Sequence, residues 1–369
     1  MDATCMFTAS TIRRALIACA TFGMLAACGG GSTGTTAPLV QSPFVGAQSV
    51  VRQVTSVDQL DNSLLPQTTP RIFNRPVTSP SFMDVDASTN PLIFVSDVSD
   101  GVVDIYPQAG KSQKMVGQIT GFAQPQGLAT DTKADLFVAN TNDSNVLVYA
   151  PPYTKTPMLT IDDVGQFPAA VAVSSTGLVA VTNICKAPDC RPGTASVSFY
   201  PKDSSKACAT VSDTTNFPRI TFAAFDKSGN LYIDGTIDRI ITAFGIVSGG
   251  CKATSITNIA VTYTIGFPGS LQVDNAGRIA VTDGVRYQVE TFDPPTDGEL
   301  GAPTSLTALK NSKNDVSSAL LASGKDLYGV DSGTGRASEF AYGSDGAALD
   351  SIAGGGQPIG VAVTPPILP

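Results

Sequence analysis

Residues 218–235 read PRITFAAFDKSGNLYIDG, and this stretch decides the fold of the chain. A proline opens it, and two runs of aliphatic and aromatic residues flank the segment 226–230, Asp-Lys-Ser-Gly-Asn. Because Asp can bond its own downstream backbone and Gly accepts a positive φ, this segment predicts a tight turn between two strands. Variants of the stretch recur about every 46 residues from Phe82 onward. The recurrence predicts a repeat architecture, but it does not specify a reaction.

Each repeat opens with a strand-like segment. These first strands are expected at 82–86, 127–131, 170–173, 221–226, 270–274 and 317–321, with a last copy at 359–363. Four of the units begin with a Phe close to a Pro. The prolines are Pro125, Pro168, Pro218 and Pro268. Proline suits the first position of a strand because no hydrogen bond of the ladder is lost there.

Two further strands follow in every unit. Short apolar runs predict second strands at 92–96, 136–139, 178–182, 231–233, 278–282 and 327–330. More alternating runs predict third strands at 103–106, 146–149, 196–200, 240–244, 288–292 and 337–342. A fourth, more polar strand completes the unit, for example at 158–162.

Four antiparallel strands per unit at this period are typical of a β-propeller blade. We therefore predict an all-β chain that forms a β-propeller of four-stranded antiparallel blades. Six blades are expected, with the surplus strand at 359–363 closing the ring. Seven blades are the alternative, in which residues 45–80 complete a further blade. A β-sandwich would not reproduce the strand–turn–strand spacing six times.

The segment 125–131, Pro-Gln-Gly-Leu-Ala-Thr-Asp, followed by 136–140, Leu-Phe-Val-Ala-Asn, resembles NHL-type and YVTN-type propeller repeats. The segment 358–363, Pro-Ile-Gly-Val-Ala-Val, is a second copy of the opening pattern. The resemblance covers about residues 80–365 and implies the propeller fold. It does not imply one function, because propellers carry many functions.

The N-terminal region reads as an export signal. Arg13 and Arg14 precede an apolar run that ends in Leu25-Ala26-Ala27-Cys28. These four residues resemble the bacterial lipobox, which implies cleavage before Cys28 and attachment of lipid to its sulfur. An ordinary secretory signal with an incidental cysteine is the alternative, and the twin-arginine pattern fits poorly.

The predicted organisation is a lipoprotein signal peptide at 1–27, a flexible tether and N-terminal segment at 28–75, and the propeller at 76–369. The expected location is the cell envelope, outside the cytoplasm, with a lipid anchor as the only attachment to the membrane. Gly29 after the lipidated cysteine resembles the outer-membrane sorting choice, so the outer membrane or a periplasm-facing position is favoured over the inner membrane.

Composition excludes several classes of chemistry. The formal net charge is −8 and basic residues do not cluster, which argues against nucleic acid as a partner. His is absent, so His-dependent catalytic triads and His zinc sites are excluded. Trp is absent as well, and Glu occurs only at Glu290, Glu299 and Glu339.

The resemblance to propellers allows the enzyme branches of this architecture to be tested. Propeller lactonases hold a metal with an early-blade Glu, and here no Glu precedes Glu290. Streptogramin-type and amidating lyases depend on His, and quinoprotein propellers resemble Trp-docked blades. Each of these branches lacks a residue type that it needs.

Each predicted second strand ends near an Asp or Asn. This candidate polar ring at the channel mouth comprises Asp97, Asn140, Asn183, Asp234, Asp283 and Asp331. Such a ring could bind a divalent cation such as calcium, or a polyol. The favoured interpretation is structural, because Asp and Asn at a strand end commonly cap the next turn. No catalytic residue, metal ligand or resident cofactor is assigned from the sequence.

With Cys28 acylated, four cysteines remain in the exported chain, and disulfides are expected. Cys185 and Cys190 would staple the loop after the second strand of the third unit. Cys208 and Cys251 lie at matching places in the third and fourth units and would tie neighbouring blades, if their outer strands come close enough. A metal site is the alternative, although C-x4-C without His is a weak pattern.

The predicted function is a membrane-tethered scaffold that binds an unknown protein or small-molecule ligand without catalysis. The alternative is a metal-dependent hydrolase or lyase with an Asp/Asn site at the channel mouth. A role in outer-membrane protein assembly would rest on analogy alone. A specific site is expected where one repeat departs from the others, because features shared by all six repeats belong to the architecture.

Overall fold

The computed structural model describes residues 91–108, 114–236, 242–353 and 356–367. The chain divides into two compact units, 1–47 and 48–369, and every described residue belongs to the second. Cys28, the leader, the tether and the strand predicted at 82–86 lie outside the described residues. Within the described ranges, no helix is long and apolar enough to cross a membrane.

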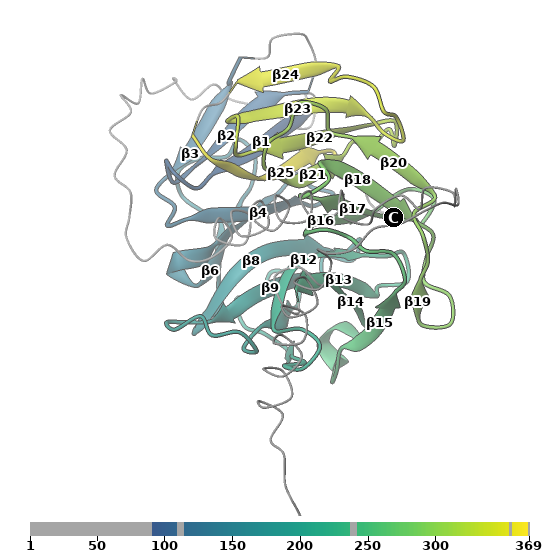
Figure 1. Ribbon diagram of the computed structural model, residues 1–369. Coiled ribbons are helices and arrows are strands. Elements are labelled where there is room, and N and C mark those ends of the chain that lie inside the picture. Colours follow the sequence, from purple (N-terminus) through teal and green to yellow (C-terminus); the bar gives the residue numbers. More distant parts are fainter. Residues whose placement is uncertain (1–90, 109–113, 237–241, 354–355, 368–369) are drawn as a thin grey trace, which may run out of the picture. The chain divides into compact units, whose positions relative to one another are not determined.

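The described chain is an all-β propeller of six blades, which confirms the predicted fold class and blade number (Figure 1). Blades 1 and 2, from the inner strand outward, are β25 (Pro358–Thr364), β1 (Leu92–Asp97), β2 (Val102–Pro107), β3 (Gly117–Thr120), and β4 (Pro125–Thr130), β5 (Leu136–Asn140), β6 (Asn145–Tyr149), β7 (Leu159–Asp162). Blades 3 and 4 are β8 (Gln166–Val173), β9 (Val179–Lys186), β10 (Ser196–Tyr200), β11 (Ala209–Val211), and β12 (Arg219–Phe225), β13 (Leu231–Thr236), β14 (Thr242–Val247), β15 (Thr257–Val261). Blades 5 and 6 are β16 (Pro268–Val273), β17 (Ile279–Asp283), β18 (Gln288–Phe292), β20 (Ser305–Ala308), and β21 (Asp315–Leu320), β22 (Asp326–Asp331), β23 (Arg336–Ala341), β24 (Asp350–Ala353).

Three short elements lie outside this scheme. Two are single 3-10 turns, η1 (Thr141–Asp143) and η2 (Gly250–Lys252). The third is β19 (Glu299–Leu300), which leaves blade 5 and pairs in parallel with the outer strand β15 of blade 4. Blade 4 therefore has a covered outer edge, which reduces the risk of pairing with another chain.

The ring closes through the strand that the sequence marks as surplus. β25 pairs antiparallel with β1 from Leu92↔Thr364 to Asp97↔Pro358, and β2 occupies the other edge of β1. The last described strand thus supplies the inner strand of the first blade. The first blade thus combines β1, β2 and β3 with β25, and the ring has six blades.

The turns between first and second strands form as their sequence predicts. Asp226 Oδ1 accepts hydrogen bonds from the N–H groups of Ser228 and Asn230, both at 2.8 Å. Gly229 takes a φ of 80°, which favours glycine. Asp274 and Gly277 repeat this arrangement in blade 5.

Side chains between the blades form the hydrophobic core. Val197 and Phe199 of blade 3, for example, pack in one cluster with Ile220, Leu231 and Ile233 of blade 4. All five side chains are buried, because strands that lie between two neighbouring sheets are covered on both faces. A single blade could not bury these residues, so the ring stabilises every blade through its neighbours.

In blades 1, 3 and 5, a hydroxyl group on the second strand makes a hydrogen bond to the inner strand of the next blade. The residue before the strand-end Asp or Asn is Ser96 in blade 1, Thr182 in blade 3 and Thr282 in blade 5. Ser96 donates to the carbonyl of Gln126 in blade 2 at 2.6 Å, and Thr182 donates to the carbonyl of Thr221 in blade 4 at 2.7 Å.

These carbonyls are available because the inner strands bulge. The register of β4 shifts between Pro125 and Leu128, and that of β12 shifts between Ile220 and Ala223. A bulge leaves a residue of the ladder unpaired, so a hydroxyl from the next blade can satisfy it. Blades 2, 4 and 6 have Ala139, Ile233 and Val330 at the equivalent position, and in blade 2 the nearby Thr141 instead donates to the carbonyl of Pro168 in blade 3 at 2.8 Å.

Candidate binding site at the strand ends of the blades

The six residues of the predicted polar ring are all buried, with exposed fractions of 5% or less. Each lies at or near the end of the second strand of its blade: Asp97, Asn140, Asn183, Asp234, Asp283 and Asp331. None of them lines the central channel, whose cavity of about 120 Å³ is bounded by the inner strands. The described residues that line this cavity include no charged side chain.

Blade 5 shows the full form of the strand-end contact. Asp283 Oδ2 accepts a hydrogen bond from the N–H of Gly266, which precedes the inner strand, at 2.7 Å. Asp283 Oδ1 accepts from the N–H groups of Val285 and Arg286, both at 2.9 Å, in the turn that follows. The Arg286 guanidinium pairs with Oδ2 at 2.7 Å. Both carboxylate oxygens are therefore used in holding two loops to the strand end.

Three other blades repeat this contact. Asp97 accepts from the N–H of Gln357 at 3.0 Å, and Asn140 accepts from the N–H of Ala123 at 2.7 Å. Asp331 accepts from the N–H groups of Lys313 and Asn314 at 2.8 and 2.9 Å. In each case the donor lies in the segment that leads into the inner strand. The hydrogen bonds agree with the structural interpretation favoured by the sequence.

Blade 4 departs from this arrangement. Asp234 Oδ1 accepts from the Thr221 hydroxyl at 2.7 Å and from the Phe222 N–H at 2.8 Å, both within the inner strand. Oδ2 has no hydrogen-bond partner among the described residues. Complete burial raises the pKa of Asp234 to about 7, because the charged form loses its hydration.

Blade 3 departs further. Asn183 donates through Nδ2 to the hydroxyls of Ser196 and Ser198, at 3.1 and 3.2 Å. Its Oδ1 has no partner in the described part of the chain. The loop that leads into the inner strand of blade 3 instead contributes Asp163, whose Oδ1 accepts from the Tyr200 hydroxyl at 2.7 Å. Sequence reasoning missed Asp163, which stands five residues before Pro168, as Asp213 stands five residues before Pro218 in the next unit.

Glu290 is a second buried acid that the sequence did not single out as a site. Its Oε1 accepts from Gln288 at 2.7 Å and from Arg286 at 3.3 Å, while Oε2 has no partner within the described ranges. Burial, and then the charge of Asp283, raise the pKa of Glu290 to about 7. Its position in the middle of β18 gave no signal beyond the scarcity of Glu in the chain.

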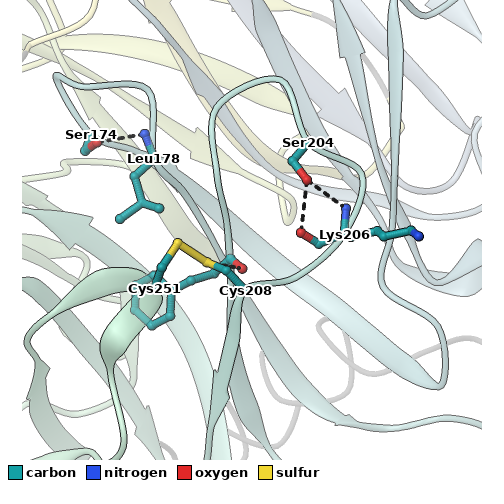
Figure 2. The surroundings of a disulfide bond; sticks show 7 residues. Ser174, Leu178, Ser204, Lys206, Cys208 and Cys251 are labelled. Carbon is teal, nitrogen blue, oxygen red and sulfur yellow. Dashed lines mark hydrogen bonds between the residues drawn. A yellow bond between two sulfur atoms is a disulfide. The ribbon is translucent and has the colours of Figure 1, made fainter.

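Both expected disulfides are formed. Cys185–Cys190 closes the loop after β9, with a Cα–Cα distance of 4.8 Å. Cys208–Cys251 joins the start of the outer strand of blade 3 to η2 in blade 4, with a Cα–Cα distance of 5.0 Å (Figure 2). Leu178, from the hairpin that begins at Ser174, lies beside this second disulfide (Figure 2). The outer parts of these blades do come close enough for a bridge.

The loop at 186–195, here called the blade 3 loop, is fixed from several sides. The N–H of Ala187 donates to the carbonyl of Gly165, and the N–H of Gly193 donates to the carbonyl of Pro218. Its tip exposes an ion pair between Arg191 and Asp189 at 3.1 Å, with side chains 77% and 61% exposed. Val164, next to Gly165, is 85% exposed. The blade 3 loop and the neighbouring turn at 163–165 thus present charged and apolar groups side by side.

The metal-binding interpretation of the ring finds no ligand cluster to support it. In the part of the chain that the structure describes, no three or more His, Cys, Asp or Glu side chains gather as a metal-binding group. The four cysteines discussed above are paired with one another. A divalent cation at the ring stays a prediction.

Comparison with known proteins finds similarity in the fold alone. No family model matches the chain, and no curated protein matches it. A solved structure from a nidogen/laminin complex is 14% identical, with a TM-score of 0.56, and the match covers 74% of this chain and 98% of the other. A protein from Lactobacillus plantarum is 14% identical, with a TM-score of 0.52 and coverage of 74% and 99%. The hydrazine synthase of Kuenenia stuttgartiensis is 15% identical, with a TM-score of 0.53 and coverage of 79% and 92%.

These similarities to propeller-like structures show the fold alone, since identities near 14% carry no shared site. Fold and strand ends together define the class: a six-bladed propeller, closed by its last strand, in which four blades use the strand-end Asp or Asn as a loop clasp and two do not.

Proposed function

We propose that the protein is a membrane-tethered lipoprotein of the cell envelope, and that its NHL- or YVTN-type propeller serves as a non-enzymatic scaffold for an unknown protein or small-molecule ligand. The lipid would be carried by Cys28, and no nucleic acid would be bound. The single observation that carries the binding role is the blade 3 loop, which is held in one conformation and exposes its tip. Loops that a rigid scaffold fixes in place are the usual recognition elements of such folds.

The fixed backbone matters because binding costs the entropy of ordering each loop. Cys185–Cys190 and the contacts to Gly165 and Pro218 would lower that cost, because they hold the loop at three points before a partner arrives. The exposed ion pair of Arg191 and Asp189 would provide charged contacts at the rim, and Val164 would add apolar area. The neutral, narrow channel offers no comparable set of groups.

Export is supported by two independent features. The apolar run before Cys28 reads as a leader, and the disulfides are typical of proteins outside the cytoplasm. Replacing Cys28→Ser should move the protein from the membrane fraction to the soluble envelope fraction, and mass spectrometry of the wild type should find lipid on Cys28. A variant that still fractionates with membranes would contradict the anchor.

The binding role is tested by photo-crosslinking in intact cells. A photoreactive residue is placed at Val164 or Arg191 in the candidate surface, and at Lys227 or Asn275 in exposed turns of other blades as matched controls. We expect one discrete crosslinked partner from the first pair and none from the second. Equal crosslinking from all four positions, or none, would count against the blade 3 loop as the recognition surface.

A further inference from the structure

A group of buried polar side chains lies between blades 2 and 3, and it belongs to none of the strand-end clasps. We call Asp163, Asn183, Ser196, Ser198 and Tyr200 the blade 3 polar cluster. All five are buried, with exposed fractions of 4% or less. Asp163 comes from the turn after β7 of blade 2, and the other four come from β9 and β10 of blade 3.

Alternation along β9 and β10 explains why these side chains meet. Val179, Val181 and Asn183 point to one face, which packs against blade 2, since Val179 and Val181 share a cluster with Phe137 and Val148. Across the ladder, Tyr200 pairs with Val179 and Ser196 pairs with Asn183. The interface is therefore apolar along most of its length and becomes polar at the strand-end side.

The cluster contains more hydrogen-bond acceptors than donors. Tyr200 gives its hydroxyl proton to Asp163 Oδ1, and Asn183 Nδ2 donates to Ser196 and Ser198. Two oxygens are left without a partner among the described residues: Asp163 Oδ2 and Asn183 Oδ1. A buried acceptor without a donor costs about 1–3 kcal/mol, so two in one cluster point to a missing group.

The charge of Asp163 limits what the missing group can be. Within the described residues, no Lys or Arg forms an ion pair with Asp163. Other buried acids of this chain do have such partners: Asp283 pairs with Arg286, and Asp274 pairs with Arg278 at 2.7 Å. A buried carboxylate needs a positive partner, several hydrogen-bond donors or a proton, and the Tyr200 hydroxyl is the one donor to Asp163 whose distance is given above.

We propose that the blade 3 polar cluster binds a hard cation, with Asp163 Oδ2 and Asn183 Oδ1 as its protein ligands. Carboxylate and amide oxygens are ligands that Ca²⁺ takes, and its flexible geometry tolerates hydroxyls and waters in the remaining positions. Na⁺ shares this preference for oxygen and would balance the single negative charge. The ion would link the turn at 163–165 to β9, and so support the base of the blade 3 loop from below. This inference goes beyond the proposed function and does not depend on it.

The competing occupant is a proton. Burial raises the pKa of Asp163, and the hydrogen bond from the Tyr200 hydroxyl is the largest effect that opposes this shift. A neutral Asp163 could donate from Oδ2 to Asn183 Oδ1 and would need no ion. The two occupants differ in what they predict for added cations, so one experiment separates them.

The experiment measures thermal unfolding of the purified protein after chelator treatment, in choline chloride buffer, with added CaCl2, NaCl or MgCl2 at matched ionic strength. We expect Tm to rise by about 2–4 °C with CaCl2 or NaCl. Whichever of the two ions gives the larger shift at equal concentration is the occupant. MgCl2 should give little, because Mg²⁺ demands a small octahedral site. An unchanged Tm with CaCl2 and with NaCl would overturn the proposal and favour the proton.

Three variants assign the effect to the cluster. Asp163→Asn keeps the acceptor for Tyr200 and should abolish the shift. Asn183→Asp adds a second carboxylate and should enlarge it. Asp162→Asn removes the same charge from the exposed neighbouring residue and should leave it unchanged. A shift that survives in Asp163→Asn, or that is lost equally in Asp162→Asn, would show that the ion binds elsewhere.

Discussion

Blades 5 and 3 have the same strands in the same order, yet their strand-end side chains do different things. In blade 5, the two carboxylate oxygens of Asp283 accept hydrogen bonds from three backbone N–H groups and pair with the Arg286 guanidinium. In blade 3, Asn183 meets no backbone donor and keeps an oxygen without a partner among the described residues. A strand-end residue that recurs in the sequence therefore has a structural role where its oxygens accept hydrogen bonds from the loops. Where an oxygen has no donor among the described residues, the same residue is available for another role.

The largest effect should come from removing the filled clasp. Asp283→Ala leaves three buried N–H groups and the Arg286 charge without their acceptor, so we expect a loss of about 3–5 kcal/mol in the free energy of unfolding. Asn183→Ala in blade 3 should cost about 1–2 kcal/mol, because no backbone donor loses its partner. Urea denaturation of both variants measures the difference. Equal losses would mean that Asp283 and Asn183 play the same structural role in their two blades.

The next effect concerns how blades 3 and 4 are joined. Cys208–Cys251 closes a loop across a sequence separation of 43, whereas Cys185–Cys190 spans 5. Loop-closure entropy predicts losses of about 4 and about 2 kcal/mol when each pair is replaced by Ser. Guanidinium denaturation of the two double variants tests this order. The reverse order would mean that the blade 3 loop contributes more stability than the bridge between blades.

Blade 4 gives a pH-dependent version of the comparison. The folded pKa of Asp234 is raised to about 7 from an ordinary value of 3.8, so the folded protein holds a proton that the unfolded chain releases. Its contribution to stability is therefore full below about pH 4 and is lost as the pH rises toward 7. We expect Asp234 to account for a fall of about 2–3 kcal/mol in the free energy of unfolding between pH 5 and pH 8.

Asp234→Asn mimics the neutral acid and keeps the acceptor for Thr221 and Phe222. The variant should lose part of the slope of stability against pH, because Glu290, with a pKa also raised to about 7, and Asp163, whose pKa is raised by burial, still titrate. Denaturation curves at four pH values for wild type and variant measure the slopes. Identical slopes would mean that Asp234 is ionised in the folded protein.

The smallest effect concerns the interblade hydroxyls. Thr182→Val removes the donor to the carbonyl of Thr221 with little change in volume, and should cost about 1 kcal/mol. Val330→Thr in blade 6 offers a matched control, because that blade has no hydroxyl at this position. Its added hydroxyl should not stabilise the protein. A stabilising Val330→Thr would show that the alternation between blades is accidental.

The fold was predictable because its signals are local and repeated. Each turn such as Asp226 to Asn230 carries its own chemistry, and six copies fix the spacing of the strands. The count of six followed from the six repeated units, and the surplus strand at 359–363, which left seven blades as the alternative, pairs with β1. The expected disulfides followed from matching positions in adjacent units.

The departures within the strand ends were not predictable, because they depend on contacts between segments far apart in sequence. Asp234 and Asp283 have similar neighbours in sequence, yet one accepts from its inner strand and the other from the loop before it. Asp163 could be recognised as part of a buried cluster only from the structure, in which β9 and β10 place Asn183 and Tyr200 beside it. The raised pKa of Glu290 likewise arises from burial between sheets, which no local pattern encodes.

The closure of the ring by β25 also sets an order of events in time. Blade 1 is the first blade to be synthesised. The N–H of Leu92, however, donates a hydrogen bond to the hydroxyl of Thr364, which is synthesised 272 residues later. Until then β1 has an open edge, and its neighbours Ile93 and Phe94 lack the strand that buries them. An open strand edge is a site for wrong pairing, so the growing or translocating chain needs protection over this whole interval. We expect truncation before Pro358 to yield a protein that aggregates rather than a propeller with one thin blade.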